Sequence, residues 1–387
     1  MQGESMWKYL VNRLLQIVIT LFVFFALTYF LLDAQPGDIT LQYVMNPKFT
    51  PEMRESLQKR LGLDRPVYER FFKWMGNTLK GDLGESYQLK RPVMDVILER
   101  APRTIFLFLT AAIIQFVVGY WLGRVLAWER GTGLEYSVTV VGAALYTVFT
   151  PWLALMMIYL FGFTLKWVPI GKFLTAKLWL RAPVNANFIF NRLLLTAFIF
   201  AVVAALIYFF TRKLNPHKSR WIRLVGILAA LAICVGVWVV GENGVLAFDI
   251  LWHMVLPIFV LLLVSFSGTM LLTRTTMLDT LREDYIMAAR AKGLPEKVVR
   301  DKHAARNALL PVFTNFVIGL PFILAGGIIT ETIFSWEGMG LTLLTASTTG
   351  DIPMVMGAFL FIGSLALFAH LFADIAYAFL DPRIRYS

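Results

Sequence analysis

Long apolar runs separated by polar segments dominate the chain. The first run, from Leu14 to Leu32, carries no charged residue and is long enough to cross a bilayer as a helix. Seven further runs follow, and this pattern predicts an all-α polytopic membrane protein with about eight spans. The eight predicted spans are Leu14–Leu32, Ile105–Leu122, Tyr136–Phe161, Leu193–Phe210, Leu224–Val240, His253–Leu272, Leu309–Ile329 and Met354–Phe372.

The polar stretches between the runs divide the chain into five parts. We expect an N-terminal transmembrane helix in residues 1–33 and a small helical, extracytoplasmic lobe in residues 34–103. Residues 104–190 hold two spans and an external amphipathic segment, and residues 191–245 form an extra transmembrane hairpin. Residues 246–387 then contain the remaining spans, joined by a charged cytoplasmic loop at 275–308.

Two short helices are expected in the lobe. For the first, Thr50 suits the N-cap, Pro51 suits the first turn, and Gly62 can end the helix. The second runs from about Pro66 to Lys80 with Gly81 as its stop, because its apolar residues recur at helical spacing. The residues expected on its buried face are Val67, Phe71, Trp74 and Met75.

Basic residues indicate the orientation. Lys8 and Arg13 precede the first span, which predicts a cytoplasmic N-terminus. The hairpin turn from Arg212 to Arg223 is strongly basic and is also expected inside, and the remaining spans return the C-terminus to that side. Residues 165–191 carry four basic side chains on the predicted outer side, but the order of the other spans fixes their location. We interpret the hairpin as a peripheral, lipid-facing addition rather than a functional contact.

Composition supports a membrane protein and excludes several other classes. Of the 387 residues, 58% are hydrophobic and only 16% are charged, which is wrong for a soluble domain. The net charge of +11 fits positive loops facing anionic lipid, so no nucleic-acid partner is expected. The single cysteine, Cys234, allows neither a disulfide within the chain nor a cysteine metal cluster. The first apolar run is too long for a cleavable signal peptide.

The most informative polar stretch runs from Arg282 to Pro311. Asp284 to Lys292 can form a short helix, which Gly293 is expected to end in a left-handed conformation. A helix this short is marginal in water by itself and needs a partner surface. One face of the helix is nearly flat and forms the predicted docking surface, with Tyr285, Ala288, Ala289 and Lys292 at i, i+3, i+4 and i+7.

This stretch resembles the cytoplasmic coupling loop of ABC-transporter permeases, the loop that docks into the ATP-hydrolysing subunit. Ala288, Ala289 and Gly293 match its Ala-Ala-x-x-x-Gly spacing, whereas Met287 replaces the leading Glu. The downstream Ile-x-Leu-Pro of the family is replaced by residues 303–306. Further stretches that are similar to the dipeptide and oligopeptide subgroup lie at residues 61–71, 81–86, 289–294, 306–311 and 377–386.

The resemblance implies a type I ABC importer permease. Its partners would be a second homologous permease, two ATP-binding subunits and an extracytoplasmic substrate-binding protein, in the inner membrane with both termini cytoplasmic. No cofactor is expected in this chain, since ATP and Mg would be bound by the partner subunits. The sequence itself contains no P-loop and no Gly-x-Ser-x-Gly elbow, and neither catalytic nor metal-binding residues are predicted.

Two other classes remain open at this point. A secondary carrier or channel would transport without ATP, but such carriers usually need buried ionisable groups. The predicted spans are nearly free of carboxylates, and the exception, Asp374, lies near the cytoplasmic end of the last span. A membrane-embedded enzyme would need a convergent nucleophile or carboxylate pair, which the spans do not offer. The substrate is not determined, because similar permeases carry peptides, nickel, glutathione-like peptides or oligosaccharides.

Small or polar residues in the core spans are candidates for lining a translocation path. Each of them could equally pack between helices, as small and hydroxylated side chains commonly do, and we favour packing for most of them. The candidates are Gln115, Thr147, Ser265, Ser267, Gly268 and Asn315.

Overall fold

The computed structural model describes residues 6–34, 65–212, 216–324 and 327–380. Within these ranges the backbone is helical apart from short connections, which confirms the predicted all-α polytopic fold. Seven of the described helices are long and apolar enough to cross a membrane, or eight spans exist if one bent pair counts as a span. The predicted Thr50–Gly62 helix and the C-terminal end of the 377–386 match lie outside the described residues.

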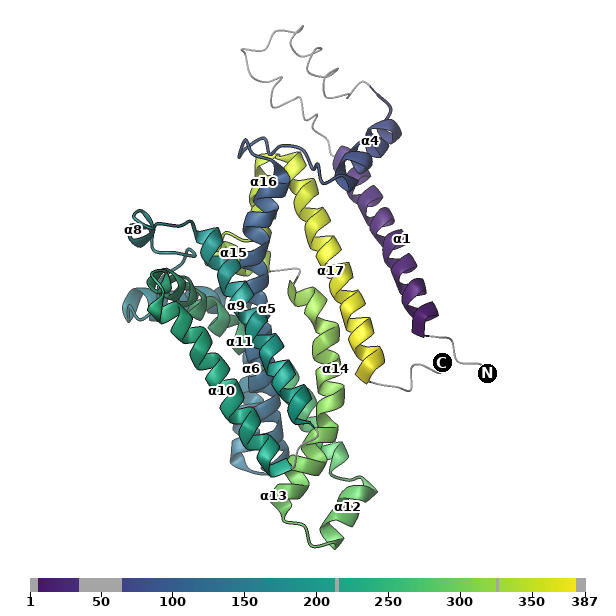
Figure 1. Ribbon diagram of the computed structural model, residues 1–387, viewed down its shortest axis with the longest axis vertical. Coiled ribbons are helices and arrows are strands. Elements are labelled where there is room, and N and C mark those ends of the chain that lie inside the picture. Colours follow the sequence, from purple (N-terminus) through teal and green to yellow (C-terminus); the bar gives the residue numbers. More distant parts are fainter. Residues whose placement is uncertain (1–5, 35–64, 213–215, 325–326, 381–387) are drawn as a thin grey trace.

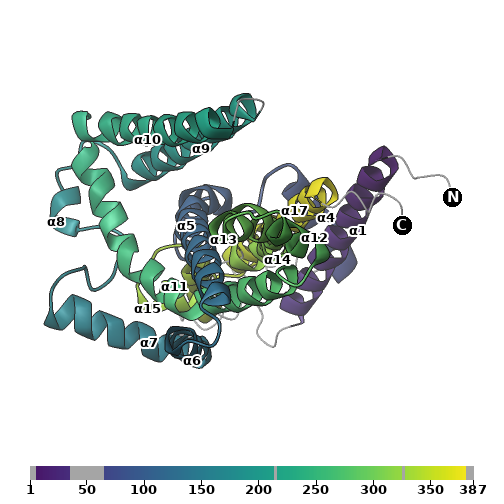
Figure 2. The same cartoon turned by 90° about the horizontal axis from the view of Figure 1, so that it is seen from below.

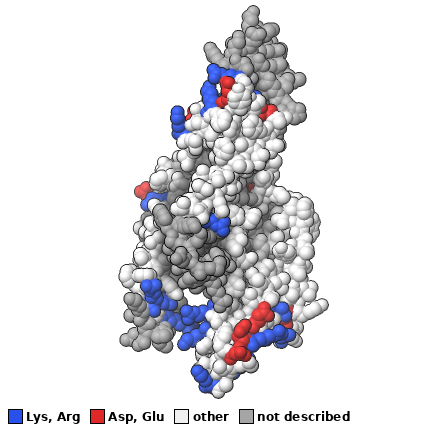
Figure 3. All heavy atoms as spheres, turned by 90° about the vertical axis from the view of Figure 1, so that its right-hand side faces the viewer, with Lys and Arg blue, Asp and Glu red and all other residues white. Residues whose placement is uncertain are grey.

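The helices run mostly along the long axis of the molecule (Figure 1). On the face shown in Figure 3, charged side chains gather towards the two ends and leave a broad, largely uncharged band between them. Such a band suits the hydrocarbon core of a bilayer.

The elements are α1 (Met6–Asp33), α4 (Val67–Leu79), α5 (Val93–Trp128), α6 (Gly133–Thr147), α7 (Thr150–Met157), η1 (Ile158–Thr164), α8 (Ala176–Trp179), α9 (Ala186–Thr211), α10 (Pro216–Val240), α11 (Gly244–Thr280), α12 (Asp284–Ala291), α13 (Glu296–Val298), η2 (Val299–Ala304), α14 (Ala305–Leu324), α15 (Ile328–Ile333), α16 (Met339–Thr349) and α17 (Ile352–Leu380).

The predicted third span is not one straight helix. Residues 136–161 are divided between α6 and the continuous α7–η1 segment, and the two axes differ by 104°. Val148 and Phe149 at the break have extended backbones, with ψ of 136° and 105°. Pro151 then occupies the first turn of α7, where its missing N–H costs nothing, so the sequence favours a new helix start at this point.

Several predicted boundaries also move. The helix α5 begins at Val93, so it continues through the expected end of the lobe at residue 103 and contains Pro102. The second lobe helix is confirmed as α4, with Phe71 and Met75 buried and Gly81 at φ +84° after its end. Its Phe71 ring packs against the aromatic rings of α1, including Tyr29 at 5.5 Å between centroids.

The helices α5 and α11 form the central pair of the molecule. Gly119 and Gly123, one turn apart on α5, lie against Thr269 and Thr273 on α11. A methyl group at Gly123 would lie 2.5 Å from the Met270 carbonyl oxygen, so the two backbones approach more closely than any larger residue allows. Small residues at this spacing are a typical means of packing helices in membranes, where lipid offers no hydrophobic drive for association.

The extra hairpin of α9 and α10 is confirmed as two helices, which run beside one another along one edge of the molecule (Figure 2). Most of their side chains are exposed in the isolated chain. The start of α9 differs, because Ile189, Phe190 and Leu193 are buried in one cluster with Leu107 of α5 and Trp336. The hairpin is therefore attached to the core by its first two turns, which the predicted boundary at residue 191 divides.

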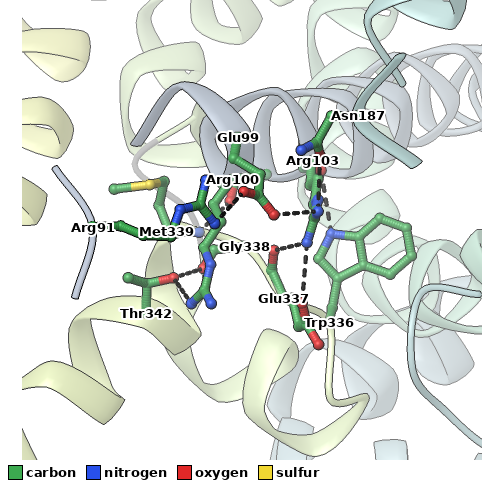
Figure 4. A network of polar contacts seen from close by, with 11 residues as sticks. Arg91, Glu99, Arg100, Arg103, Asn187, Trp336, Glu337, Gly338, Met339 and Thr342 are labelled. Atoms are coloured by element: carbon green, nitrogen blue, oxygen red, sulfur yellow. Dashed lines mark hydrogen bonds and ion pairs between the residues drawn. The ribbon is translucent and has the colours of Figure 1, made fainter. Parts of the chain in front are cut away.

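A buried arginine joins the base of this hairpin to the core (Figure 4). The Arg103 side chain is 3% exposed and donates to Glu99 at 3.1 Å, to Glu337 at 3.2 Å and to the Asn187 side-chain oxygen at 2.8 Å. The indole N–H of Trp336 donates to the Arg103 carbonyl oxygen at 3.2 Å. Three segments distant in sequence thus meet at one charged group, which the sequence analysis did not single out.

Candidate coupling site

The predicted coupling loop forms a compact end of the molecule, where α11 is followed by α12, α13, η2 and α14 (Figure 1). The helix α12 covers Asp284 to Ala291, in agreement with the predicted short helix. Gly293 follows with φ +73°, which confirms the left-handed residue expected at its end. The Gly293 N–H donates to the Arg290 carbonyl at 2.9 Å, and Pro295 precedes α13 as its N-cap.

One side of α12 is packed against its own chain. Ile286 is fully buried and Ala289 is 6% exposed, in a cluster with Met277 of α11, Val299 of η2 and Ala127 of α5. Small alanines supply most of the remaining surface of this cluster, so α12 approaches the neighbouring helices closely. The helix is short, and this contact provides the tertiary packing that its length requires.

This packing corrects the predicted docking face at Ala289, which points into the chain and is not available to a partner. Tyr285 is 40% exposed but accepts a hydrogen bond from the Asn307 side-chain amide at 2.7 Å. The physical reason is that Ile286 packs against Met277 and Val299, and Ala289, three residues on, lies on the same inward side of the helix.

The exposed face lies one residue earlier along the helix. Asp284, Met287, Ala288 and Ala291 are all exposed and occupy positions i, i+3, i+4 and i+7, so they share one side of α12. Met287 is 55% exposed. Two residues of the predicted docking face remain available: Ala288 lies on this exposed surface, and Lys292 is exposed at its edge. We refer to Asp284, Met287, Ala288 and Ala291 as the α12 outer face.

Ion pairs and hydrogen bonds tie the loop to the long helices. Within the loop, the Arg290 guanidinium pairs with Glu296 at 3.0 Å and closes the turn between α12 and α13. Arg124 of α5 pairs with Asp301 of η2 at 2.8 Å, and the Tyr120 hydroxyl donates to the Ala305 carbonyl at 3.0 Å. These contacts join the loop and the start of α14 to α5.

The loop also borders a cationic cavity of about 320 Å³. Arg130, Arg282 and Arg290 line it together with Trp128 and Glu296. A second polar contact lies nearby, where Arg274 of α11 pairs with Glu135 at the start of α6. The α12 outer face is thus largely apolar, and charged side chains lie around it, as is common in protein contact surfaces.

The candidate path residues do not share one environment. Ser267 is fully buried beside Gly142 of α6, and a methyl group on that glycine would lie 3.3 Å from the Ser267 Cβ, so Ser267 packs between helices. Thr147, Gly268 and Asn315 are exposed, and Gln115 and Ser265 are half-buried. The Thr147 hydroxyl donates to the Ala144 carbonyl of its own helix at 3.0 Å. Five of the six therefore stay available to line a path.

The sequence analysis missed a buried carboxylate outside the spans. Glu331 of α15 is fully buried, where its two oxygens accept from the Thr104 hydroxyl at 2.7 Å and from the Leu341 N–H at 2.8 Å. Burial raises the pKa of Glu331 to about 7. The turn that covers it needs glycine at Gly338, because a side chain there would strike Glu331 and Thr104. A glutamate shortly before a Gly-x-Gly turn was the available signal.

A second such carboxylate, Asp351, fastens the segment before α5 to the start of α17. It is 2% exposed and accepts from the Ser86 hydroxyl at 2.5 Å and from the Tyr87 and Gln88 N–H groups, each at 3.1 Å. Ser86 lies in the lobe that is predicted outside the membrane, and Asp351 lies in the connection between the last two predicted spans. The contact holds the end of the molecule remote from α12.

Comparison with known proteins supports one family throughout. Residues 115–386 match the family model of the binding-protein-dependent transport system inner membrane component, and residues 6–108 match its N-terminal domain. The di/tripeptide transport system permease protein DppB of Pseudomonas aeruginosa is 31% identical over 99% of this chain and 100% of its own length. The oligopeptide transport system permease protein AppB of Bacillus subtilis is 29% identical, and the dipeptide transport system permease protein DppB of Escherichia coli is 31% identical, with at least 98% of this chain and all of each relative covered. The chain therefore belongs to the family of binding-protein-dependent transport system inner membrane components, as a multi-pass permease of the inner membrane.

Proposed function

We propose that this chain is one of two membrane-spanning subunits of an ATP-driven peptide importer and that α12 couples it to an ATPase subunit. The observation that carries the proposal is the α12 outer face. Asp284, Met287, Ala288 and Ala291 expose a largely apolar, low-relief surface at one end of the molecule, while the opposite side of the helix is fixed in the core. An exposed apolar patch with a charged surround suits a protein partner.

Rigid attachment makes this surface suitable for transmitting motion. The α12 helix is continuous in packing with α11 through Met277 and with α14 through Ala308, and Asp301 is paired to Arg124 of α5. A partner that moves α12 would move these three long helices together. Packed elements with two discrete arrangements are the usual basis of alternating access.

The peptide specificity and the partners extend this proposal. The relatives named above are peptide permeases, and this chain is similar to them over nearly its whole length. A second homologous permease would complete the path, two ATP-binding subunits would bind ATP and Mg, and a binding protein would deliver the peptide. In this arrangement the α12 end and both termini face the cytoplasm, since ATP is available there.

A substitution on the outer face tests the coupling role. Ala288→Glu adds bulk and a charge to a contact that accepts a methyl group, and it should leave the buried side of α12 intact. We expect a complex carrying Ala288→Glu to lose about tenfold in both peptide-stimulated ATP hydrolysis and peptide uptake in proteoliposomes. Ala288→Ser, which keeps the residue small and uncharged, serves as the control and should retain both activities.

The rival transport mechanisms give different results in the same assay. A secondary carrier would take up peptide without ATP, and its uptake would be insensitive to Ala288→Glu. A membrane-embedded enzyme would consume substrate without moving it across the bilayer. Wild-type rates for Ala288→Glu in both ATP hydrolysis and uptake would remove α12 as the coupling element.

A further inference from the structure

A second cleft of about 630 Å³ lies at the base of the bent α7–η1 segment, away from α12. Apolar side chains of α7, η1 and α15 form part of its wall, with Ile158 and Ile333 among them, and Val168 and Ile170 extend the wall from the connecting loop. Its polar side chains are Lys166, Lys172 and Ser335. The volume falls in the range that small-molecule sites occupy.

The backbone of this cleft is strained at each of its polar side chains. Lys166, Lys172 and Ser335 have φ of +54°, +68° and +49°. Among the described parts of the chain, only one other non-glycine residue has a positive φ, namely Lys90. Left-handed backbone is unfavourable for residues with a Cβ, and such strain clusters at functional sites, where the surrounding structure holds it in place.

Close packing supplies the support that this conformation needs. The Lys172 N–H donates to the Phe334 carbonyl oxygen at 2.8 Å, so the loop is joined directly to the end of α15. A methyl group on Gly171 would lie 3.0 Å from that same oxygen, and one on Gly162 of η1 would lie 3.2 Å from Ile170. Next to Lys166, the Leu165 N–H donates to the Leu160 carbonyl and the Trp167 N–H donates to the Phe161 carbonyl, each at 2.9 Å. Hydrogen bonds of the backbone therefore set the main-chain positions of both lysines.

The charges of the cleft are unbalanced. None of its lining residues is acidic, and within the described ranges neither Lys166 nor Lys172 forms an ion pair. Glu331, the acidic residue closest in sequence to the end of α15, turns its carboxylate towards Thr104 and the Leu341 N–H instead. Two ammonium groups beside an apolar wall suit a ligand with one carboxylate and one apolar group.

We propose that this cleft is an entry subsite that binds the C-terminal carboxylate of the transported peptide through Lys166 and Lys172, with the adjoining apolar side chain against Ile158 and Val168. The inference rests on the proposed peptide-import function and adds to it a recognition site within the permease. The ammonium groups pair with the carboxylate, and the strained loop fixes the backbone that carries both lysines before the peptide arrives, which reduces the entropy lost on binding.

Direct occupancy is tested by protection of a thiol. In a Cys234→Ala background, Ser335→Cys places an accessible thiol in the cleft, and its labelling rate by a membrane-impermeant maleimide is measured in the assembled complex without ATP. We expect millimolar alanyl-leucine to slow labelling about threefold and its C-terminal amide to have no effect. In the Lys166→Gln/Lys172→Gln variant the free acid should no longer protect.

Transport tests the same site independently. With saturating binding protein, Lys166→Gln/Lys172→Gln should lower the peptide transported per ATP hydrolysed about fivefold. By contrast, a complex that carries Lys172→Arg keeps the positive charge and should retain most of the wild-type ratio of peptide transported to ATP hydrolysed. Lys177→Gln, a matched change on α8 outside the cleft, should behave as wild type.

The outcomes separate the two proposals. Equal labelling with and without alanyl-leucine, in a wild-type complex that imports the peptide with ATP, would overturn the subsite alone. Protection by the peptide-free binding protein but not by the peptide would also overturn it, and would assign the cleft to a protein contact. Failure of the wild-type complex to import any peptide would instead contradict the proposed function.

Discussion

Two helix pairs in this protein are similarly apolar but differ in their surroundings. The most apolar windows of α5 and α11 are 28% and 33% buried, whereas those of α9 and α10 are each 6% buried in the chain. The window of α9 is nevertheless the most apolar of the four. In a membrane protein, hydrophobicity predicts that a helix spans, but packing detail decides whether it lies in the core, because lipid and protein interior are equally apolar.

The difference between the pairs lies in particular residues. The α5–α11 contact uses Gly119 and Gly123 against threonines, while Gly236 on α10 has no neighbouring atom within reach of an added methyl group. Charge follows the same division. Arg103 of α5 is buried among two carboxylates and an amide, whereas Arg192 of α9 is exposed and lies over the Trp238 ring at 5.6 Å.

The largest effect is expected at Arg103. Arg103→Leu would remove the hydrogen bonds to Glu99, Glu337 and Asn187. Glu99 would keep its ion pair with Arg91, and Glu337 is half-exposed, so we expect the lost hydrogen bonds to cost about 3 kcal/mol. We expect loss of stable complex in detergent, measured by size-exclusion chromatography and a thermal unfolding assay. Arg192→Leu is the matched control on the hairpin and should cost less than about 1 kcal/mol. Equal effects of the two substitutions would contradict the distinction between core and periphery.

A smaller effect is expected at the glycines. Gly123→Ala forces a methyl group against the Met270 carbonyl and Thr273, so α5 and α11 must separate, at a cost of about 1–3 kcal/mol. The measurement is the unfolding midpoint of the purified permease complex. Gly236→Ala makes the same chemical change on α10 and should leave the midpoint unchanged or slightly raised, because alanine favours helix. A lower midpoint for Gly236→Ala than for Gly123→Ala would reverse the comparison.

The buried Glu331 is expected to make the stability of the core depend on pH. Its pKa is raised from 4.5 in the unfolded chain to about 7 in the fold, so the folded state holds this proton more tightly. The stabilisation is complete below about pH 4.5 and is lost as the pH rises towards 7, by up to about 3 kcal/mol. The unfolding midpoint of the wild type should therefore fall over this range.

Glu331→Gln supplies the control for this pH dependence. The amide does not titrate, so this contribution to the slope should disappear. Below about pH 4.5 the midpoint of Glu331→Gln should lie lower than that of the wild type, because an amide cannot accept both hydrogen bonds that Thr104 and Leu341 donate. A wild-type slope in the Gln variant would assign the pH dependence to other groups.

The smallest effect is expected from shortening the hairpin. Trp238 donates to the Thr196 hydroxyl at 3.3 Å, so the two helices can be joined at this level by a short Gly-Ser linker. Removing residues 198–236 keeps Ile189, Phe190 and Leu193 in the core cluster. ATP-dependent uptake should stay within about twofold of wild type. Loss of assembly with the second permease would show that the hairpin is an interface.

The start of the hairpin illustrates what sequence patterns miss. Apolar periodicity predicts a span from Leu193 to Phe210 that faces lipid, but Leu193 is 7% exposed and packs in the core. A lipid-facing leucine and a core leucine look the same in sequence. The same limit explains why Arg103 and Glu331 were not predicted, since one partner of each lies more than 200 residues away along the chain, namely Glu337 for Arg103 and Thr104 for Glu331.

At the coupling loop, the sequence determined the helix and its end, and the tertiary structure decided which side is available. Asp284 to Ala291 form the helix and Gly293 ends it, because capping and left-handed backbone are local properties. The choice between Ala288 and Ala289 as the outward residue depended on Met277, Val299 and Ala304, which surround Ile286 and Ala289 only after the chain folds.

For the molecule as a whole, the sequence by itself determined the membrane class, the number of apolar runs and the family, because length, hydropathy and short motifs are read along the chain. Only the tertiary structure decided the 104° angle between α6 and α7, the glycine contact of α5 with α11 and the cleft of Lys166 and Lys172. These features depend on which surfaces face protein rather than lipid. That choice is made by shape and by partners distant in sequence, since the free energy of burying an apolar side chain is nearly the same in either surrounding.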